Sequence, residues 1–217
     1  MANHLFDLIR KAMPEASKPF LYLQDGGTMS YGDFLAGTGR YANALRALGV
    51  KPGDRVVAYL PNTPEAAIAF YACASIGAIW SSCSPDMGSA SVLDRFRQIE
   101  PKVLIACDGV RYGGKDLARA EVVAELRAAL PSVQHLVLLR NLGLDEGALA
   151  PLQPFTDFGA ACARDDAATA AFEPVWLPFD HPLWIVYSSG TTGLPKPIVH
   201  GHGGIMIVAL ALKTLHN

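Results

Sequence analysis

The residues best suited to chemistry lie together in the segment 187–196, which reads Tyr-Ser-Ser-Gly-Thr-Thr-Gly-Leu-Pro-Lys. Such a loop can surround an anion, because glycines permit close approach and positive φ, hydroxyls donate hydrogen bonds, and a lysine adds a full charge. The apolar run 182–187 before it predicts a buried strand. The anion that we expect is the triphosphate of a nucleotide. The segment is not a Walker A loop, because Gly190 and Gly193 are three positions apart and Lys196 follows a proline.

Residues 188–196 resemble the phosphate-loop signature of the adenylate-forming superfamily, which includes acyl-CoA synthetases, luciferases and the adenylation domains of peptide synthetases. The segments 60–62 (Leu-Pro-Asn), 80–86 (Trp-Ser-Ser-Cys-Ser-Pro-Asp) and 199–204 (Val-His-Gly-His-Gly-Gly) are most similar to acetoacetyl-CoA synthetases. The resemblance covers the chain from about Asp54 onward. The first fifty residues are more similar to malonyl-CoA synthetases, so a hybrid or engineered chain is an alternative.

The resemblance implies an acid–thiol ligase that forms AMP in two steps. A carboxylate first attacks the α-phosphorus of ATP, giving an acyl-adenylate and pyrophosphate, and the thiol of coenzyme A then displaces AMP. The implied cofactors are ATP, Mg²⁺ and coenzyme A, and the expected acid is acetoacetate, with acetate and malonate as alternatives. Lys196 is the expected catalytic cation for the departing pyrophosphate. The residues that the resemblance assigns to the β- and γ-phosphates are Ser188, Ser189, Gly190, Thr191, Thr192, Gly193 and Lys196. A turn without function is the competing interpretation, and the match at nine restrictive positions argues against it.

His200 and His202 form a pair two residues apart. On a strand they would share a face, so zinc is an alternative; no third ligand can be named, and we expect no metal site. The resemblance implies instead that His200 or His202 lines the channel for the substrate carboxylate, and we place His202 among the catalytic candidates. A histidine at a helix start with no catalytic role is the competing interpretation.

The segment 80–86 ends a predicted strand with several hydroxyls, and open α/β sheets bind ligands at the carboxyl ends of their strands. It could therefore shape the site or support the phosphate loop, and a simple Ser-Pro-Asp turn is the alternative. Cys83 is not expected to be a nucleophile, because no basic residue lies near it in the sequence.

Strand and helix patterns alternate along the chain, which predicts an α/β fold with a mostly parallel sheet flanked by helices. The predicted strands cover residues 20–23, 55–60, 78–82, 103–106, 135–139, 182–187 and 197–200. The predicted helices cover residues 5–12, 63–76, 91–100, 117–130 and 203–215, together with one that a capping box at 30–33 opens and Gly49 ends. The segment 141–178 is predicted to be an irregular surface excursion with one short helix over 157–163.

Composition narrows the class of protein. With 217 residues, 51% of them hydrophobic, the chain can bury a sizeable core. A net charge of −2 without any basic run argues against nucleic acid as a partner, and the uncharged apolar stretch 66–80 is too short for a membrane span. Four cysteines without a C-x-x-C pair predict reduced thiols in the cytoplasm.

The superfamily's later motifs for adenine, ribose and Mg²⁺, its hinge and its C-terminal lid domain with a catalytic lysine cannot be located before Asn217. We therefore expect residues 1–217 to be the N-terminal portion of an adenylation (AMP-binding) domain whose substrate is a small carboxylate. We expect this chain to be inactive on its own. The alternative is a non-catalytic module that self-associates, or pairs with another chain, through the strongly apolar segment 203–215.

Overall fold

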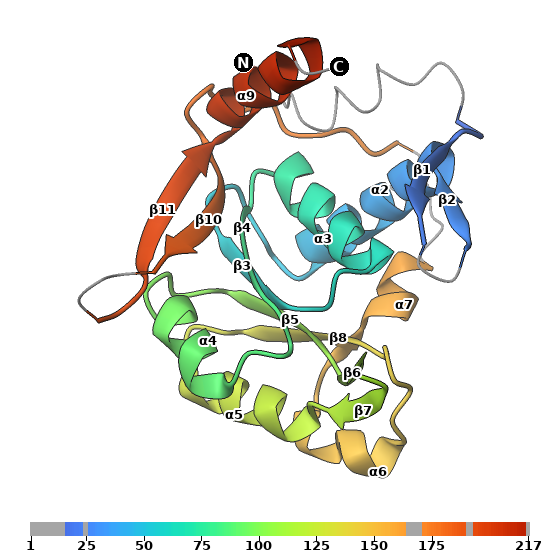
Figure 1. The fold of residues 1–217 in the computed structure, drawn as a ribbon, viewed down its shortest axis with the longest axis vertical. Coiled ribbons are helices and arrows are strands. Elements are labelled where there is room, and N and C mark those ends of the chain that lie inside the picture. Colours follow the sequence, from blue (N-terminus) through green and yellow to red (C-terminus); the bar gives the residue numbers. More distant parts are fainter. Residues whose placement is uncertain (1–15, 24–25, 164–170, 190–192, 216–217) are drawn as a thin grey trace.

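The structure is a computed structural model that describes residues 16–23, 26–163, 171–189 and 193–215. A seven-stranded sheet runs through it in the order β11-β10-β4-β3-β5-β8-β9 (Figure 1). Its strands are β3 (Arg55–Tyr59), β4 (Ile79–Cys83), β5 (Val103–Cys107), β8 (His135–Leu139), β9 (Thr156–Asp157), β10 (Pro182–Ser188) and β11 (Lys196–Gly201). All neighbours are parallel except β10 and β11, which form an antiparallel hairpin at one edge. This arrangement confirms the predicted α/β fold with a mostly parallel sheet.

Helices cover both faces of the sheet (Figure 1). One face packs against α2 (Tyr31–Ala47), α3 (Pro64–Ser75) and α7 (Phe158–Cys162), and the other against α4 (Ser89–Phe96) and α5 (Ala120–Ala129). Alternate residues of β3 divide between the two cores: Val56 and Ala58 join the first, and Val57 and Tyr59 join the second. Because side chains on a strand alternate between faces, a strand buried on both sides must be apolar throughout, as this run is.

The helix starts follow the local signals in the sequence. Ser30 accepts a hydrogen bond from the backbone N–H of Asp33 at 3.1 Å, which confirms the N-cap half of the predicted capping box. The Asp33 carboxylate accepts from the Ser30 hydroxyl at 2.6 Å, whereas the reciprocal bond of a capping box comes from the N-cap backbone N–H. Gly49 follows α2 with a φ of 78°, as a helix-ending glycine should. Pro64 is the first residue of α3 and Thr63 is its N-cap residue, but the Thr63 side chain makes no capping hydrogen bond.

The helix predicted over 117–130 begins only at Ala120. The residues before it form an antiparallel hairpin of β6 (Gly109–Tyr112) and β7 (Lys115–Ala118). Gly113 and Gly114 join the two strands with φ values of 57° and 77°. Two consecutive positive φ angles define the tight turn that fits the twist of a hairpin, and only glycine adopts them freely. The Gly-Gly pair was thus a turn signal that the helical interpretation overlooked.

The segment 141–178 contains more regular structure than predicted. It includes α6 (Glu146–Leu149), a 3-10 turn η1 (Ala150–Leu152), strand β9 and α7. Because β9 pairs with β8, this segment completes one edge of the sheet and is not a purely irregular excursion. The short helix predicted over 157–163 is confirmed by α7, whose first turn is capped by the Asp157 side chain. The helix predicted over 5–12 lies outside the described residues.

The remaining elements lie toward the two ends of the described chain. A small hairpin of β1 (Pro19–Tyr22) and β2 (Thr28–Ser30) precedes α2 and confirms the strand predicted at 20–23. At the other end, β11 leads directly into α9 (His202–Leu215) (Figure 1). The strand predicted over 197–200 and the helix predicted over 203–215 are therefore both present. Several apolar side chains of this last pair of elements are exposed, namely Ile198, Val199, Ile207, Val208, Leu210, Leu212 and Leu215.

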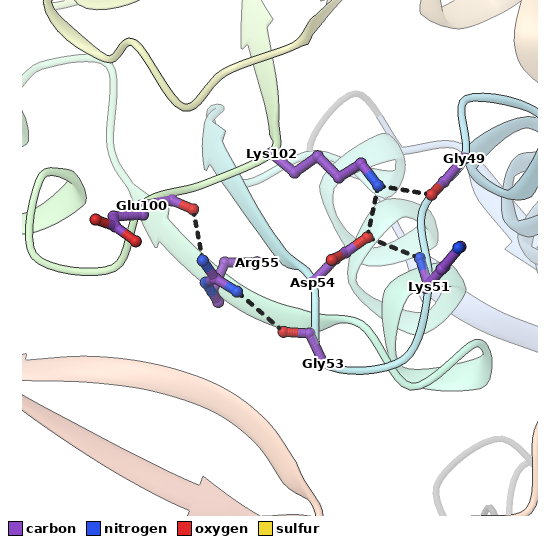
Figure 2. Close-up of polar contacts among 7 residues, drawn as sticks. All are labelled: Gly49, Lys51, Gly53, Asp54, Arg55, Glu100 and Lys102. Atoms are coloured by element: carbon purple, nitrogen blue, oxygen red, sulfur yellow. Dashed lines mark hydrogen bonds and ion pairs between the residues drawn. The ribbon is translucent and has the colours of Figure 1, made fainter.

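A network of charged side chains fastens the amino ends of β3 and β5 (Figure 2). The Lys102 ammonium donates to the Gly49 carbonyl at 2.7 Å and to the Asp54 carboxylate at 2.9 Å. The Arg55 guanidinium donates to the Ile99 carbonyl at 2.6 Å and to the Glu100 carbonyl at 2.9 Å. These contacts tie the loops that enter two adjacent strands to one another.

Candidate active site

The hairpin of β10 and β11 presents both ends of the predicted phosphate loop. Ser188 is the last residue of β10 and Lys196 the first of β11, and the two are register partners across the antiparallel ladder. Directly opposite residues of such a ladder have neighbouring Cβ atoms and share a face. The strands therefore deliver a hydroxyl and an ammonium side chain to the same side of the base of the loop.

The exposure of the loop residues suits contact with a ligand. Ser188, Ser189 and Lys196 are exposed, and Gly193 has a φ of 131°, in the region that favours glycine. Gly190, Thr191 and Thr192 lie outside the described residues. Their assignment to the phosphates, like that of the other loop residues, remains a prediction.

Strand β10 is hydrogen-bonded to two other elements, β4 and α4. The Ser81 hydroxyl, on β4, donates to the Ile185 carbonyl at 2.7 Å, and both groups are buried. The Tyr187 hydroxyl donates to the carbonyl of Arg95 on α4 at 2.8 Å. Burial raises the pKa of Tyr187 to about 12, so the phenol remains a donor at neutral pH. Ser81 belongs to the segment 80–86, so this contact favours the interpretation in which that segment supports the phosphate loop.

A cavity of about 510 Å³ lies at the carboxyl ends of β3 and β4 and beside β10. The rings of Phe70, Trp80 and Trp184 surround part of it, with centroids 6.0 Å apart for Phe70 and Trp80 and 5.6 Å apart for Phe70 and Trp184. Its neutral lining comprises Leu60, Pro61, Asn62, Ala66, Ala67, Phe70, Trp80, Ser82, Cys83, Ser84, Trp184, Ile185 and Val186. Two of the sequence motifs, 60–62 and 80–86, thus meet at one cavity with the strand that leads into the loop. Nothing in the local sequence indicated the contribution of Phe70, because it comes from the tertiary packing of α3.

Cys83 lines this cavity, and its environment keeps the thiol protonated. Burial raises its pKa to about 11, although the Arg95 charge opposes the shift. A thiol with this pKa carries little thiolate at neutral pH, in agreement with the expectation that Cys83 is not a nucleophile. All four cysteines are free, and burial also raises the pKa of Cys107 and Cys162 to about 12.

The two histidines of the H-x-H pair occupy different environments. His200 lies on β11 opposite Trp184, with ring centroids 6.2 Å apart, and is half-buried. His202 is the first residue of α9 and fully buried; its backbone N–H donates to the His181 carbonyl at 2.9 Å. The ring of His181 lies 5.8 Å from that of His202, and its Nε2 is 2.8 Å from the Gly77 carbonyl oxygen. Sequence reasoning did not anticipate His181, and the roles predicted for His200 and His202 remain predictions.

The described residues form neither a cluster of metal ligands nor a helix that could span a membrane. In the parts of the chain that the structure describes, no three or more His, Cys, Asp or Glu side chains are grouped so that they could hold a metal ion. Likewise, none of the described helices combines the length and the apolar character that crossing a bilayer requires.

The amino-acid sequence of this chain matches a known protein family and several characterised enzymes. The family model described as "AMP-binding enzyme" matches residues 9–217. The chain is 44% identical over 181 residues to an acetoacetyl-CoA synthetase of Rattus norvegicus, covering 82% of this chain and 27% of that protein. It is 43% identical over 189 residues to an acetoacetyl-coenzyme A synthetase of Rhizobium meliloti, covering 87% of this chain and 28% of that one.

A solved structure agrees with these sequence matches. The acetoacetyl-CoA synthetase from Streptomyces lividans has a TM-score of 0.86 and 39% sequence identity to this chain. The match covers 98% of this chain and 32% of that one. The chain therefore spans less than a third of the length of each of these relatives.

Proposed function

Because the chain belongs to the AMP-binding enzyme family, we propose that it supplies the triphosphate-binding part of an ATP-dependent acid–thiol ligase. The ligase joins a short carboxylic acid to coenzyme A through an acyl-adenylate. The observation that carries the proposal is the pairing of Ser188 with Lys196 across the base of the loop. A hydroxyl donor and a full positive charge on one face are the groups that a departing pyrophosphate requires.

The side chains of the loop carry the hydrogen-bond donors and the positive charge that a triphosphate requires. The hydroxyls of Ser188 and Ser189 donate to phosphate oxygens, and Lys196 supplies the charge that offsets the negative charge on the leaving group. Bound Mg²⁺ would supply further neutralisation of the phosphates. In this reading Thr191 and Thr192 add hydroxyls, and Gly190 and Gly193 let the backbone approach the ligand.

We assign the cavity beside β10 to the uncharged portion of the acyl group or of its thioester. Its rings, aliphatic side chains and Ser and Asn groups suit a short carbon chain with one or two neutral polar atoms. The second carboxylate of malonate would lose hydration there without a compensating charge. This supports acetoacetate over malonate, in line with the acetoacetyl-CoA synthetases that the chain resembles.

Exchange of labelled pyrophosphate into ATP tests this function. We would replace the matching 32% of the Streptomyces lividans enzyme with this chain and measure exchange with acetoacetate, acetate and malonate, each with Mg²⁺. We expect acetoacetate-dependent exchange, weaker exchange with acetate and the weakest with malonate. Exchange that ignores the identity of the acid would contradict the assignment of the cavity. Absence of exchange with every acid, in a folded chimera, would contradict the proposed function.

A second function is favoured by the exposed apolar side chains of β11 and α9. Ile198 and Val199 lie on the edge strand of the sheet, and Ile207 and Val208 lie on the helix that follows. An edge strand and a bare apolar helix can pair with a second copy or with another chain. Sedimentation analysis of the 217-residue chain, with Ile198→Lys as the disrupting variant, tests whether the chain self-associates through this surface.

We place the protein in the cytoplasm on the chemistry of its thiols. All four cysteines are free, and none is paired with another. Unpaired cysteines persist where the cell keeps thiols reduced.

A further inference from the structure

The phosphate loop has two stems, Tyr187-Ser188 at the end of β10 and Pro195-Lys196 at the start of β11. We propose that Gln98 is a positioning residue that fixes the loop by joining its second stem to helix α4. The Gln98 side-chain amide donates to the carbonyl of Pro195 at 2.9 Å, although the two residues are 97 positions apart. Pro195 immediately precedes Lys196, so this hydrogen bond acts one residue away from the proposed catalytic cation.

The first stem of the loop is attached to the same end of the same helix. The Tyr187 hydroxyl donates to the Arg95 carbonyl, and the Arg95 guanidinium lies 5.8 Å from the centre of the Tyr187 ring. Tyr187 immediately precedes Ser188. Gln98 lies two residues past the end of α4, in a turn whose Gln98 backbone N–H donates to the Arg95 carbonyl at 3.2 Å. Arg95 and Gln98 therefore contact the two sides of the loop from the same end of α4.

The Gln98 amide is itself fixed from the helix side. Its Nε2 also donates to the carbonyl of Asp94 at 2.6 Å, one of the carbonyls that the end of a helix leaves without an intrahelical partner. Both hydrogens of the amide are therefore used, one on α4 and one on the loop. When the two described sides of the loop are held in place, they lose less conformational freedom as an anion binds, and this preorganisation favours binding.

The inference rests on the proposed function only in taking residues 188–196 for the phosphate loop. Amide hydrogen exchange of the ligand-free 217-residue chain tests the anchor without nucleotide. Gln98→Met keeps the length of the side chain and removes both donors without adding charge. We expect roughly two- to tenfold faster exchange over 188–196, from the loss of one exposed hydrogen bond, with the melting temperature unchanged. Gln98→Lys, which retains a donor of similar reach, should restore the exchange rates of the unchanged chain.

The matched control is Gln134→Met, because Gln134 is an exposed glutamine that precedes β8 at the other end of the sheet. It should leave exchange over 188–196 unchanged. Unchanged exchange in Gln98→Met would overturn the proposal. So would acceleration throughout the sheet together with a lower melting temperature, because that pattern belongs to a general structural role.

A second measurement separates the anchor from the proposed function. Titration of the chain with inorganic triphosphate and Mg²⁺ should show weaker binding in Gln98→Met by about the same factor. If the unchanged chain binds no triphosphate, the proposed function fails, and hydrogen exchange still decides the role of Gln98. Equal affinity in Gln98→Met and the unchanged chain would contradict the preorganisation argument.

Discussion

Charged side chains at the two ends of the sheet differ in whether they have partners within the chain. At the amino ends of β3 and β5, Asp54, Arg55 and Lys102 bond to one another or to backbone carbonyls (Figure 2). At the base of the β10–β11 loop, Lys196 is exposed, and no ion pair within the described residues involves it. Charges that stabilise the fold have their partners inside the chain, whereas a charge that serves a ligand must remain accessible to it. Substitutions at the two ends should therefore change different measurements.

Lys196→Ala should produce the largest effect, and only on activity. Removing one preorganised group that stabilises developing charge commonly lowers a rate by about 10²–10³-fold. We expect a loss of this size in acetoacetate-dependent pyrophosphate exchange by the Streptomyces chimera, with the free energy of unfolding within about 0.5 kcal/mol of the parent.

The control for this prediction is Lys51→Ala, which removes an exposed lysine from the amino end of the sheet. It should leave the exchange rate unchanged. If Lys196→Ala and Thr191→Ala both kept the parental rate of pyrophosphate exchange, the loop would not bind the phosphates. The contrast between the two ends of the sheet would then be wrong as well.

Arg55→Met should produce the next largest effect, and only on stability. The variant removes a charged donor to the Ile99 and Glu100 carbonyls and leaves both without that partner. Hydrogen bonds to charged groups contribute about 1.5–3 kcal/mol each, and part of this is recovered from water, so we expect a loss of about 2 kcal/mol in urea unfolding.

Arg111→Met is the matched control, because Arg111 pairs with Asp116 on the β6–β7 hairpin and its side chain is 72% exposed. Solvent screens an exposed pair of this kind, so it adds little to stability. Equal losses in Arg55→Met and Arg111→Met would mean that the network at the amino end is no stronger than an ordinary surface pair.

Asp54 makes the stability of the amino end depend on pH. Burial raises the pKa of its carboxyl, but hydrogen bonds from Lys102 and from the Lys51 backbone N–H, with the charges of Lys102 and Arg55, outweigh it, so the net pKa is lowered. A carboxyl with a lowered folded pKa stabilises the fold above its unfolded value, near 3.9, and this contribution disappears as the pH falls through the folded pKa.

Asp54→Asn should therefore be less stable than the parent by about 1 kcal/mol at pH 7, the size expected of a partly buried pair. The difference should shrink as the pH is lowered below about 4, because the parent carboxyl then becomes neutral as well. Urea unfolding at pH 7, 5 and 3 measures this trend. A constant difference between the two proteins at all three pH values would show that the charge of Asp54 contributes nothing.

The two ends also differ in how much of them the sequence predicts. The loop and strands β3, β5 and β8 are predictable, because apolar runs buried on both faces and a restrictive motif are local patterns. The anchors of the loop are not, because the contact from Gln98 to Pro195 joins residues far apart whose types are individually unremarkable. The β6–β7 hairpin lies between these cases, since Gly113-Gly114 is a local turn signal that an adjacent helical pattern obscured.

Glu100→Gly should produce the smallest effect, and it should be stabilising. Glu100 has a φ of 47°, a left-handed conformation that costs an L-residue with a side chain about 1–2 kcal/mol. Glycine adopts this conformation freely but loses more entropy on folding, so we expect a net gain of about 0.5 kcal/mol in urea unfolding. The hydrogen bond to Arg55 uses the Glu100 carbonyl, so the substitution leaves it in place.

Glu121→Gly, in the first turn of α5, is the control and should lose about 0.5–1 kcal/mol instead. If Glu100→Gly were destabilising by a similar amount, the Glu100 side chain would belong to the network that holds the amino end of the sheet.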